Sequence, residues 1–174
     1  MIIQQTGGKI VMKFSGDYHC EVTISSRGDR TVLLFENVTA RIRAQERINF
    51  MARYDGLTGL PNRAYFTEQV EAELASRERV GRDEPVLLAI VDIDDFKHVN
   101  DTFGHLAGDR VLSETAVRIQ SVMNRHSRLA RLGGDEFVVY RAQDTDGDAV
   151  RAEAEAILSV LQRPFEVGGE TVEL

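Results

Sequence analysis

Apolar and polar positions divide the sequence into two parts that have different periodicities. In the first part, three short segments are rich in β-branched and aromatic residues: Lys9–Phe14, Tyr18–Ser25 and Arg30–Glu36. Such segments predict β-strands, and the short connections at Gly16-Asp17 and Gly28-Asp29 predict a meander. A meander of about forty residues is small for an independent domain.

A helix is predicted from Thr39 to Tyr54, because this segment contains no glycine or proline. The Thr39 hydroxyl can cap its start by accepting a free backbone N–H. Ile42, Ile48 and Met51 share one face, which leaves two interpretations open. The helix is either a packed connector or a dimerising, signal-transmitting helix. The sequence does not decide between them, because one short apolar stripe is weak evidence for a coiled coil.

The second part alternates between helical and strand-like segments. A continuous apolar run, Val86–Val91, predicts a strand that is buried on both faces. Glycine pairs at 133–134 and 168–169 predict two hairpins. The pattern predicts an α/β (α+β) fold with a mixed, largely antiparallel sheet flanked by helices. The other predicted helices and strands are Asn62–Val80, Leu106–Asn124, Arg128–Leu132, Phe137–Arg141, Asp146–Gln162 and Phe165–Leu174.

Composition and charge exclude several classes of protein for this chain, among them nucleic-acid-binding and membrane-spanning proteins. The 174 residues are 43% hydrophobic with a net charge of −7, and residues 55–174 carry 13 basic and 23 acidic side chains. Such an acidic body repels nucleic-acid backbones, so no nucleic-acid partner is expected. One cysteine, Cys20, forms no internal disulfide, and no apolar run approaches the roughly 20 residues of a membrane span. Without a basic signal-peptide start, we expect a soluble cytoplasmic protein with no membrane segment.

Two acidic clusters are the strongest chemical signal. Asp92, Asp94 and Asp95 stand where the predicted strand ends, and Asp135-Glu136 follows the turn at Gly133-Gly134. Clustered carboxylates are costly unless a cation compensates them, and Mg²⁺ prefers such hard oxygen ligands. Taken singly, each cluster also fits a simpler role, as helix-capping acids or as exposed hairpin acids. Together, on strands of one sheet, they indicate a metal site.

The segment between these clusters permits two interpretations. Asn100 and Asp109 fit a guanine edge, because a carboxylate accepts from the guanine N–H groups and an amide both donates and accepts. In the simpler interpretation, Asp101 and Thr102 are ordinary loop and cap residues, and Asp109 stabilises the first turn of a helix. His105 is either a structural ring packed under this loop or a ligand contact.

Four motifs in order resemble the signatures of GGDEF-domain diguanylate cyclases: Asp55–Arg63, Asp92–Lys97, Gly104–Asp109 and Arg131–Phe137. The resemblance covers residues 55–174 and implies a fold similar to nucleotidyl-cyclase and polymerase palm domains. Leu33–Arg41 resembles the last strands and exit helix of a PAS sensor domain. The expected organisation is a partial PAS-like β segment (1–38), a linker helix (39–54) and a GGDEF domain (55–174).

The resemblance implies that two GTP molecules are joined into cyclic di-GMP by a homodimer in which each subunit presents one GTP. It implies Mg²⁺ (or Mn²⁺) held by Asp92, the Ile93 carbonyl, Asp135 and Glu136, with Asp135 and Glu136 as catalytic residues. A metal neutralises the polyphosphate and the charge that develops on the leaving pyrophosphate. The implied substrate contacts are Phe96, Lys97, Asn100, His105, Asp109, Gly133 and Gly134.

Two departures from the family pattern bear on activity. Asn124 and Ser127 stand where the family has the paired Arg and Asp of its product-inhibition site. The sequence given ends at Leu174, where family members continue with another strand and a helix that supplies phosphate contacts. These features leave a second hypothesis open, a GGDEF-like module that binds GTP without turnover and acts through protein contacts.

Overall fold

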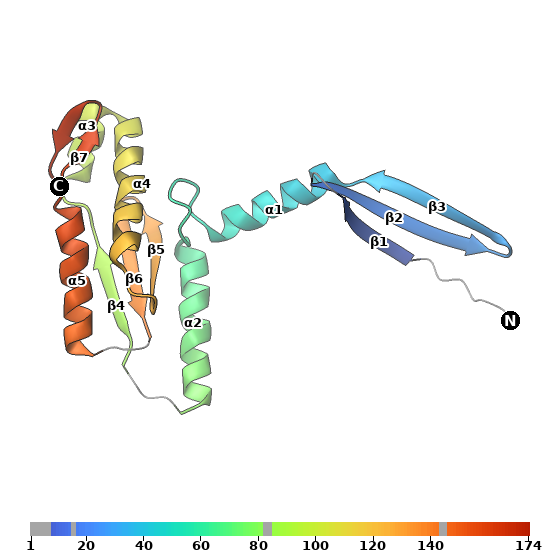
Figure 1. The fold of residues 1–174 in the computed structure, drawn as a ribbon, viewed down its shortest axis with the longest axis horizontal. Coiled ribbons are helices and arrows are strands. Elements are labelled where there is room, and N and C mark those ends of the chain that lie inside the picture. The colour runs from blue at the N-terminus through green and yellow to red at the C-terminus, as the bar shows by residue number, and fades with distance from the viewer. Residues whose placement is uncertain (1–7, 15–16, 82–84, 143–145) are drawn as a thin grey trace. The chain divides into compact units, whose positions relative to one another are not determined.

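The computed structural model describes residues 8–14, 17–81, 85–142 and 146–174. The chain divides into two compact units, Met1–Phe50 and Met51–Leu174. The first contains an antiparallel sheet and the second contains helices with small antiparallel sheets, so the predicted α+β class is confirmed (Figure 1). None of the described helices combines the length and the apolar character that crossing a membrane requires.

The first unit is a meander of three strands, β1 (Gly8–Phe14), β2 (Tyr18–Arg27) and β3 (Arg30–Asn37), in the order β1-β2-β3. Both neighbouring pairs are antiparallel. Gly28 turns the chain between β2 and β3 with a φ of 63°, a conformation that favours glycine. The predicted meander is therefore confirmed, while Gly16 of its first predicted turn lies outside the described residues.

Helix α1 (Thr39–Arg53) follows β3, and its start is tied to β2. The backbone N–H of His19 donates to the Thr39 hydroxyl at 2.8 Å, whereas the Thr39 N–H donates to Oδ1 of Asn37 at 3.0 Å. The prediction that the Thr39 hydroxyl caps the helix is therefore wrong. Asn37 supplies the capping oxygen, and Thr39 fastens the helix to the meander.

A charged cluster on β2 reinforces this junction. Glu21 is 8% exposed and accepts hydrogen bonds from Lys9 at 2.8 Å and from Arg41 at 3.1 Å. The hydrogen bond from Lys9 lowers the pKa of the Glu21 carboxyl below its usual range, and the bond from Arg41 adds to this effect. The carboxylate therefore stays ionised and links β1, β2 and the first turns of α1.

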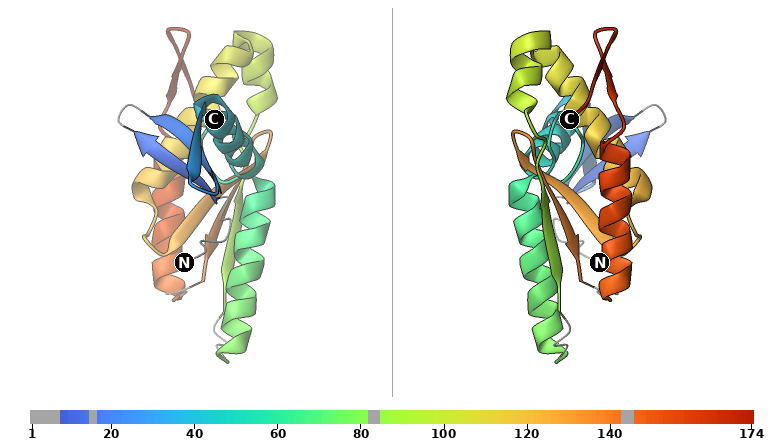
Figure 2. Two further views of the ribbon diagram at one scale, coloured as in Figure 1. Left: turned by 90° about the vertical axis from the view of Figure 1, so that its right-hand side faces the viewer. Right: turned by 90° about the vertical axis from the view of Figure 1, so that its left-hand side faces the viewer.

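The elements of the second unit are α2 (Arg63–Arg79), β4 (Leu87–Val91), α3 (Phe96–Phe103), α4 (His105–Val122), β5 (Ser127–Gly133), β6 (Glu136–Arg141), α5 (Gly147–Leu161), β7 (Phe165–Val167) and β8 (Glu170–Val172). The main sheet has the order β4-β6-β5 and is antiparallel throughout. Helix α2 covers one face, and α4 and α5 cover the other (Figures 1 and 2). Strands β7 and β8 form a separate hairpin.

The central strand β6 contributes side chains to two separate hydrophobic cores, because its alternate side chains point to opposite faces of the sheet. Phe137 and Val139 enter the core that α4 and α5 complete. Val138 and Tyr140 enter the core on the α2 side, where the Tyr140 ring meets Phe66 edge to face at 6.3 Å. All four β6 side chains are at most 2% exposed, so β6 fixes the layers of the second unit.

The prediction that the Val86–Val91 strand is buried on both faces is wrong. In the part of the chain that the structure describes, β4 pairs with β6 and lies at an edge of the sheet. Helix α2 packs against β5 at the opposite edge, so Leu88 and Ile90 on the α2 face of β4 remain 52% and 63% exposed. The alternate residues Ala89 and Val91 pack against the other core.

The interpretation of Asp101 and Thr102 as loop and cap residues is also wrong, because both lie inside helix α3. Asn100 lies inside helix α3, which Gly104 separates from α4. Gly104 has a φ of 83°, which ends α3 and redirects the chain. Asp95, just before α3, also adopts a left-handed conformation with a φ of 52°, which aspartate tolerates better than most residues.

Arg118 of α4 holds the end of α5 in place. Its guanidinium lies 3.8 Å from the centre of the Phe165 ring. It donates hydrogen bonds to three carbonyl oxygens, those of Val160, Arg163 and Pro164. Carbonyl groups at a helix C-terminus have no partner within the helix, so Arg118 supplies the missing donors and joins α4 to β7.

Replacing Arg118 by Gln should lower the free energy of unfolding by about 2 kcal/mol, because carbonyl oxygens at the end of α5 lose charged donors. Urea unfolding followed by circular dichroism measures this change. Glu114→Gln is the matched control, because it removes only the half-exposed ion pair with Arg118 and should cost less than about 0.5 kcal/mol. Equal losses in the two variants would contradict the role given to the carbonyl contacts.

Candidate functional site

The two acidic clusters meet where β4 ends and where β5 turns into β6. Val91 of β4 pairs with Phe137 of β6, so Asp92 follows β4 beside Glu136, the first residue of β6. Asp135 lies in the turn that precedes it. The antiparallel register thus brings together acids that are more than forty residues apart in the sequence.

The β5–β6 turn depends on two glycines. Gly133 and Gly134 have φ values of 139° and 56°, which side-chain-bearing residues rarely adopt. The register of the two strands also shifts between Arg131 and Gly133. Asp135 lies at the tip of this irregular turn and is partly buried. The two exposed glycines before it leave their backbone uncovered by side chains.

The acids at this end of the sheet repel one another. Asp92 is exposed, but partial desolvation and then the neighbouring charges of Asp135, Glu136 and Asp94 raise the pKa of its carboxyl above its usual range. A cation among these carboxylates would remove the repulsion. The electrostatics therefore fit a metal ion at this position.

The donor set fits Mg²⁺ or Mn²⁺ in number and kind. Among the residues that the structure describes, no three His, Cys, Asp or Glu side chains converge closely enough to hold a metal ion by themselves. Mg²⁺ usually takes only one or two protein carboxylates and completes its shell with water and substrate phosphates. Asp92, Asp135 and the Ile93 carbonyl suit that kind of site; this carbonyl also accepts the Phe96 N–H at 3.3 Å.

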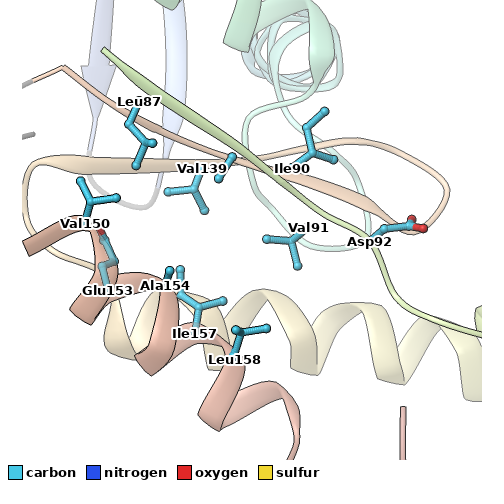
Figure 3. A pocket seen from close by; sticks show the side chains of 11 residues that line it. Leu87, Ile90, Val91, Asp92, Val139, Val150, Glu153, Ala154, Ile157 and Leu158 are labelled. Atoms are coloured by element: carbon cyan, nitrogen blue, oxygen red, sulfur yellow. The ribbon is translucent and has the colours of Figure 1, made fainter. Parts of the chain in front are cut away.

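An apolar hollow of about 430 Å³ lies between β4 and α5, next to Asp92 (Figure 3). Val91, Val139 and Ile157 point toward it, whereas the Asp92 carboxylate points to the β5–β6 turn. An apolar lining gives no compensation to a buried charge. A charged ligand therefore belongs on the turn side of Asp92.

The predicted phosphate contacts follow Asp92 directly. Lys97 lies exposed in the first turn of α3, one residue after the half-buried Phe96. The free N–H groups and positive end of a helix dipole favour anions at this position. Lys97 is also the lone lysine of residues 55–174 and follows Asp95 by two residues in the sequence.

The predicted guanine contacts lie on the helical hairpin of α3 and α4. Asn100 is half-buried on α3, while His105 and Asp109 are exposed in the first turns of α4. Asp109 lines an open groove of about 490 Å³, and Asn100 is not among the residues that line it. The structure thus places these residues on neighbouring helices without joining them in that one groove.

Gly108 explains how Asn100 fits between the two helices. A Cβ atom on Gly108 would lie 2.2 Å from Oδ1 of Asn100 and 3.1 Å from the Phe96 ring. Only a residue without a side chain permits α4 to pack this closely on α3. Gly108 therefore sets the position of Asn100, a role that the sequence analysis missed although the residue stands in its Gly104–Asp109 motif.

Arg131 supports the turn from behind and was also missed. Its guanidinium donates to the Gly134 carbonyl at 2.7 and 3.1 Å and to Oδ1 of Asp55 at 2.9 Å. Burial acts to raise the pKa of Asp55, but hydrogen bonds from Thr58 and Arg131 outweigh it and lower that pKa. The ionised Asp55 carboxylate thus fixes the position of the Arg131 guanidinium, and Arg131 in turn stabilises the β5–β6 turn through its hydrogen bonds to the Gly134 carbonyl.

A second arginine reaches the site from the start of α2. Arg63 donates to the Leu132 carbonyl at 3.2 Å and to Oε2 of Glu136 at 3.3 Å. The preceding residue, Asn62, caps α2 and donates through its amide to the Ala52 carbonyl at 3.1 Å. Consecutive residues therefore contact the last turn of α1 and the acidic cluster.

Comparison with known proteins gives the family context. Residues 52–174 match the family model described as diguanylate cyclase, GGDEF domain. Diguanylate cyclase TpbB of Pseudomonas aeruginosa is 38% identical over 149 residues, which are 83% of this chain and 34% of that protein. An uncharacterized signaling protein of Caulobacter vibrioides is 41% identical over 141 residues, 80% of this chain and 17% of its own. Cyclic di-GMP phosphodiesterase PdeR of Escherichia coli is 39% identical over 134 residues, which are 76% of this chain and 19% of that protein. The chain thus spans about a third or less of the length of these relatives.

Solved structures agree with this assignment. The GGDEF domain of TpbB from Pseudomonas aeruginosa has a TM-score of 0.62 and 37% identity, with 69% of each chain covered. The coiled coil and GGDEF domain of DgcB from Caulobacter crescentus, in complex with c-di-GMP, has a TM-score of 0.65 and 32% identity, covering 77% of this chain and 70% of that one. The resemblance of the second unit to a GGDEF domain is confirmed, whereas the PAS resemblance of the first stays a prediction.

Gly108→Ala should lower the free energy of unfolding by about 1–3 kcal/mol, because the added methyl group overlaps Asn100 and forces the helices apart. Thermal or urea unfolding measures the change, and NMR shifts of the Asn100 side-chain amide report its displacement. Gly147→Ala is the matched control, since a Cβ there meets nothing within 4 Å. That change should be neutral or stabilising by up to about 1 kcal/mol. A Gly108→Ala protein as stable as the Gly147→Ala protein would contradict the packing argument.

Proposed function

Because this chain belongs to the diguanylate cyclase GGDEF-domain family, we propose that it condenses two GTP molecules into cyclic di-GMP and pyrophosphate. The observation that carries the proposal is the crowding of Asp92, Asp135 and Glu136 beside a glycine turn, which calls for a cation and leaves room for phosphates. Diguanylate cyclases TpbB and DgcP of Pseudomonas aeruginosa are among its relatives, which supports cyclic di-GMP chemistry.

The proposed metal is Mg²⁺ or Mn²⁺, held by Asp92, the Ile93 carbonyl and Asp135, with Glu136 nearby. When bound, it neutralises the triphosphate and the negative charge that grows on the leaving pyrophosphate. Gly133 and Gly134 permit close approach of the phosphates, and Lys97 with the Phe96 end of α3 contributes positive potential.

In the proposed reaction, the ribose 3′-oxygen of each GTP attacks the α-phosphorus of the other. Two phosphodiester bonds form, the two bonds to pyrophosphate break, and two pyrophosphates leave. Asp135 takes or orients the proton of that hydroxyl, and Glu136 assists. Arg131 and Arg63 are positioning residues, because they hold the turn and Glu136 through the contacts described above. Asn100 and Asp109 read the guanine edge, and His105 makes a further substrate contact.

Each subunit of a homodimer presents one GTP in this proposal. Helix α1 offers exposed apolar side chains for pairing, because Ile48 and Met51 are 60% and 62% exposed. Ile42 lies about two and a half turns before Met51 and therefore on the opposite side of the helix, so the predicted shared face of all three residues is wrong. The meander before it is the proposed sensory segment that controls the helices. The assignment of residues 1–38, 39–54 and 55–174 to these roles, and the cytoplasmic location, stay predictions.

A second candidate is a module that binds GTP without turnover. The relative PdeR, which is named for phosphodiesterase activity, favours it. Incubation with GTP and Mg²⁺, followed by chromatography for cyclic di-GMP, separates the two. Product formation supports the cyclase, while saturable GTP binding without product supports the binding module.

Asp92→Asn and Asp135→Asn should each remove most Mg²⁺-dependent GTP binding or cyclic di-GMP formation, because each deletes a charged metal ligand. In metal-free buffer, Asp92→Asn should raise the melting temperature, because it relieves the crowding of like charges. Calorimetric GTP titrations with and without Mg²⁺, product assays and thermal scans provide the readouts. Asp148→Asn, an exposed acid on α5, is the control and should match the unmodified protein. Wild-type binding and turnover in both test variants would exclude the proposed site.

Asp109→Ala should reduce the preference for GTP over ATP by about 1–3 kcal/mol, by analogy with the loss of one good contact to a base edge. Competition titrations with the two nucleotides measure the ratio within one protein, so a general loss of folding does not imitate the effect. An unchanged ratio would show that Asp109 does not read the base.

The positions of the family's product-inhibition site have a structural use here. The backbone N–H of Asn124 donates to Glu153 at 2.7 Å, and the Ser127 hydroxyl donates to the same carboxylate at 2.8 Å. That carboxylate also accepts from the fully buried Arg141 at 2.9 Å. Neutral Asn124 and an engaged Ser127 cannot reproduce charge-assisted contacts to a nucleotide, which are about twice as strong as neutral hydrogen bonds.

Cyclic di-GMP should therefore bind only weakly outside the GTP site, and feedback inhibition should be weak. Calorimetric titration with cyclic di-GMP checks this. Submicromolar binding that Arg125→Ala or Arg128→Ala abolishes would show that the neighbouring arginines rebuild an inhibitory site, and the expectation would fail.

A further inference from the structure

A small polar cavity lies on the α2 side of the sheet, away from the acidic cluster. Its volume is about 140 Å³, and it stands at the start of β5 and the end of β6. Two arginines, a histidine and a tyrosine contribute most of its polar groups. The lining residues are Glu73, Arg125, His126, Arg128, Tyr140 and Ala142.

The arginines at this cavity have unused hydrogen-bond donors. Arg125 donates only through Nε, to Nε2 of His126 at 3.0 Å. Arg128 faces the Glu73 carboxylate at 3.7 Å, which is too long for a good hydrogen bond. Most N–H groups of these two guanidinium groups therefore have no partner among the described residues, in a unit that is otherwise strongly acidic.

Tyr140, which lines the cavity, has an unsatisfied hydroxyl. Tyr140 is 2% exposed, and its buried hydroxyl makes no hydrogen bond within the described part of the chain. Burial and the Glu73 carboxylate raise the pKa of Tyr140, so the group remains a protonated donor. A buried polar group without a partner is costly and calls for an explanation such as a bound ligand.

We propose that this cavity is a binding site for a phosphoryl oxyanion, held by Arg125, Arg128 and the Tyr140 hydroxyl. A tetrahedral phosphate offers several acceptor oxygens, matches the fork of a guanidinium group and can accept from the tyrosine at the same time. The cavity is sized for one phosphate group and not for a dinucleotide. In the bound state, phosphate replaces Glu73 as the partner of Arg128.

This site is distinct from the product-inhibition positions. Ser127 faces α5 through its hydrogen bond to Glu153, whereas the adjacent Arg128 faces α2 through Glu73. Adjacent residues of a strand point to opposite faces of the sheet, so the two places lie on opposite faces. The proposal concerns free phosphate and does not depend on cyclase activity.

The test is an NMR titration of the full chain with inorganic phosphate at constant ionic strength. Arginine Nε–H signals of Arg125 and Arg128 and the ring signals of Tyr140 should shift in a saturable manner, with chloride as the reference anion. Arg128→Gln should weaken binding about tenfold, because a charged hydrogen bond to the anion is lost. Arg151→Gln, an exposed arginine on α5, is the matched control and should leave the affinity unchanged.

Two further variants keep the test decisive if Arg128→Gln perturbs the fold. Tyr140→Phe removes only the unpartnered hydroxyl, so it should not lower the melting temperature in phosphate-free buffer but should weaken phosphate binding about threefold. Glu73→Gln removes a carboxylate that competes for Arg128 and should strengthen binding about threefold.

Three results would overturn the proposal. One is the absence of saturable shifts beyond those that chloride causes. Another is equal weakening by Arg128→Gln and Arg151→Gln, which would indicate a diffuse charge effect. The third is displacement of phosphate from these signals by cyclic di-GMP, which would make the cavity a nucleotide site.

Discussion

Like-charge repulsion is the constraint on which the second unit depends. The antiparallel register of β4 and β6 places Asp92 beside Glu136, and the charges of Asp135, Glu136 and Asp94 help to raise the pKa of the exposed Asp92 carboxyl. The surrounding structure tolerates this because arginines anchor both the backbone and the acids. Arg131 donates hydrogen bonds to the Gly134 carbonyl in the turn, and Arg63 donates to the Glu136 carboxylate and offsets part of its charge.

Local sequence rules predicted much of the fold because most elements carry their own signals. The meander, the β5–β6 hairpin and the helix before β7 follow from alternation, glycine pairs and helical spacing. Strand β4 was misjudged because burial on its α2 face depends on which strand α2 covers, and that is a non-local fact. Helix α3 was missed because it is one short helix between a left-handed Asp95 and a Gly104 break.

The candidate site likewise contains residues that the sequence predicted and residues that it did not. The acids that meet at the turn were predicted from their types and positions, because strands of one sheet bring their ends together. The residues that hold them were not predicted. Arg131 acts through a carbonyl oxygen and Gly108 acts through the absence of a side chain, and neither property has a spacing or composition that marks it in a sequence.

The pair Asn62–Arg63 has a mechanical consequence. Asn62 is bound to the Ala52 carbonyl and Arg63 is bound to Glu136, and one peptide bond joins the two residues. The two contacts therefore share one short stretch of backbone at the start of α2, so a substitution that displaces Asn62 also displaces the base of the Arg63 side chain. The start of α2 thus serves the end of α1 and the β5–β6 turn at once, which makes it a poor place for an insertion.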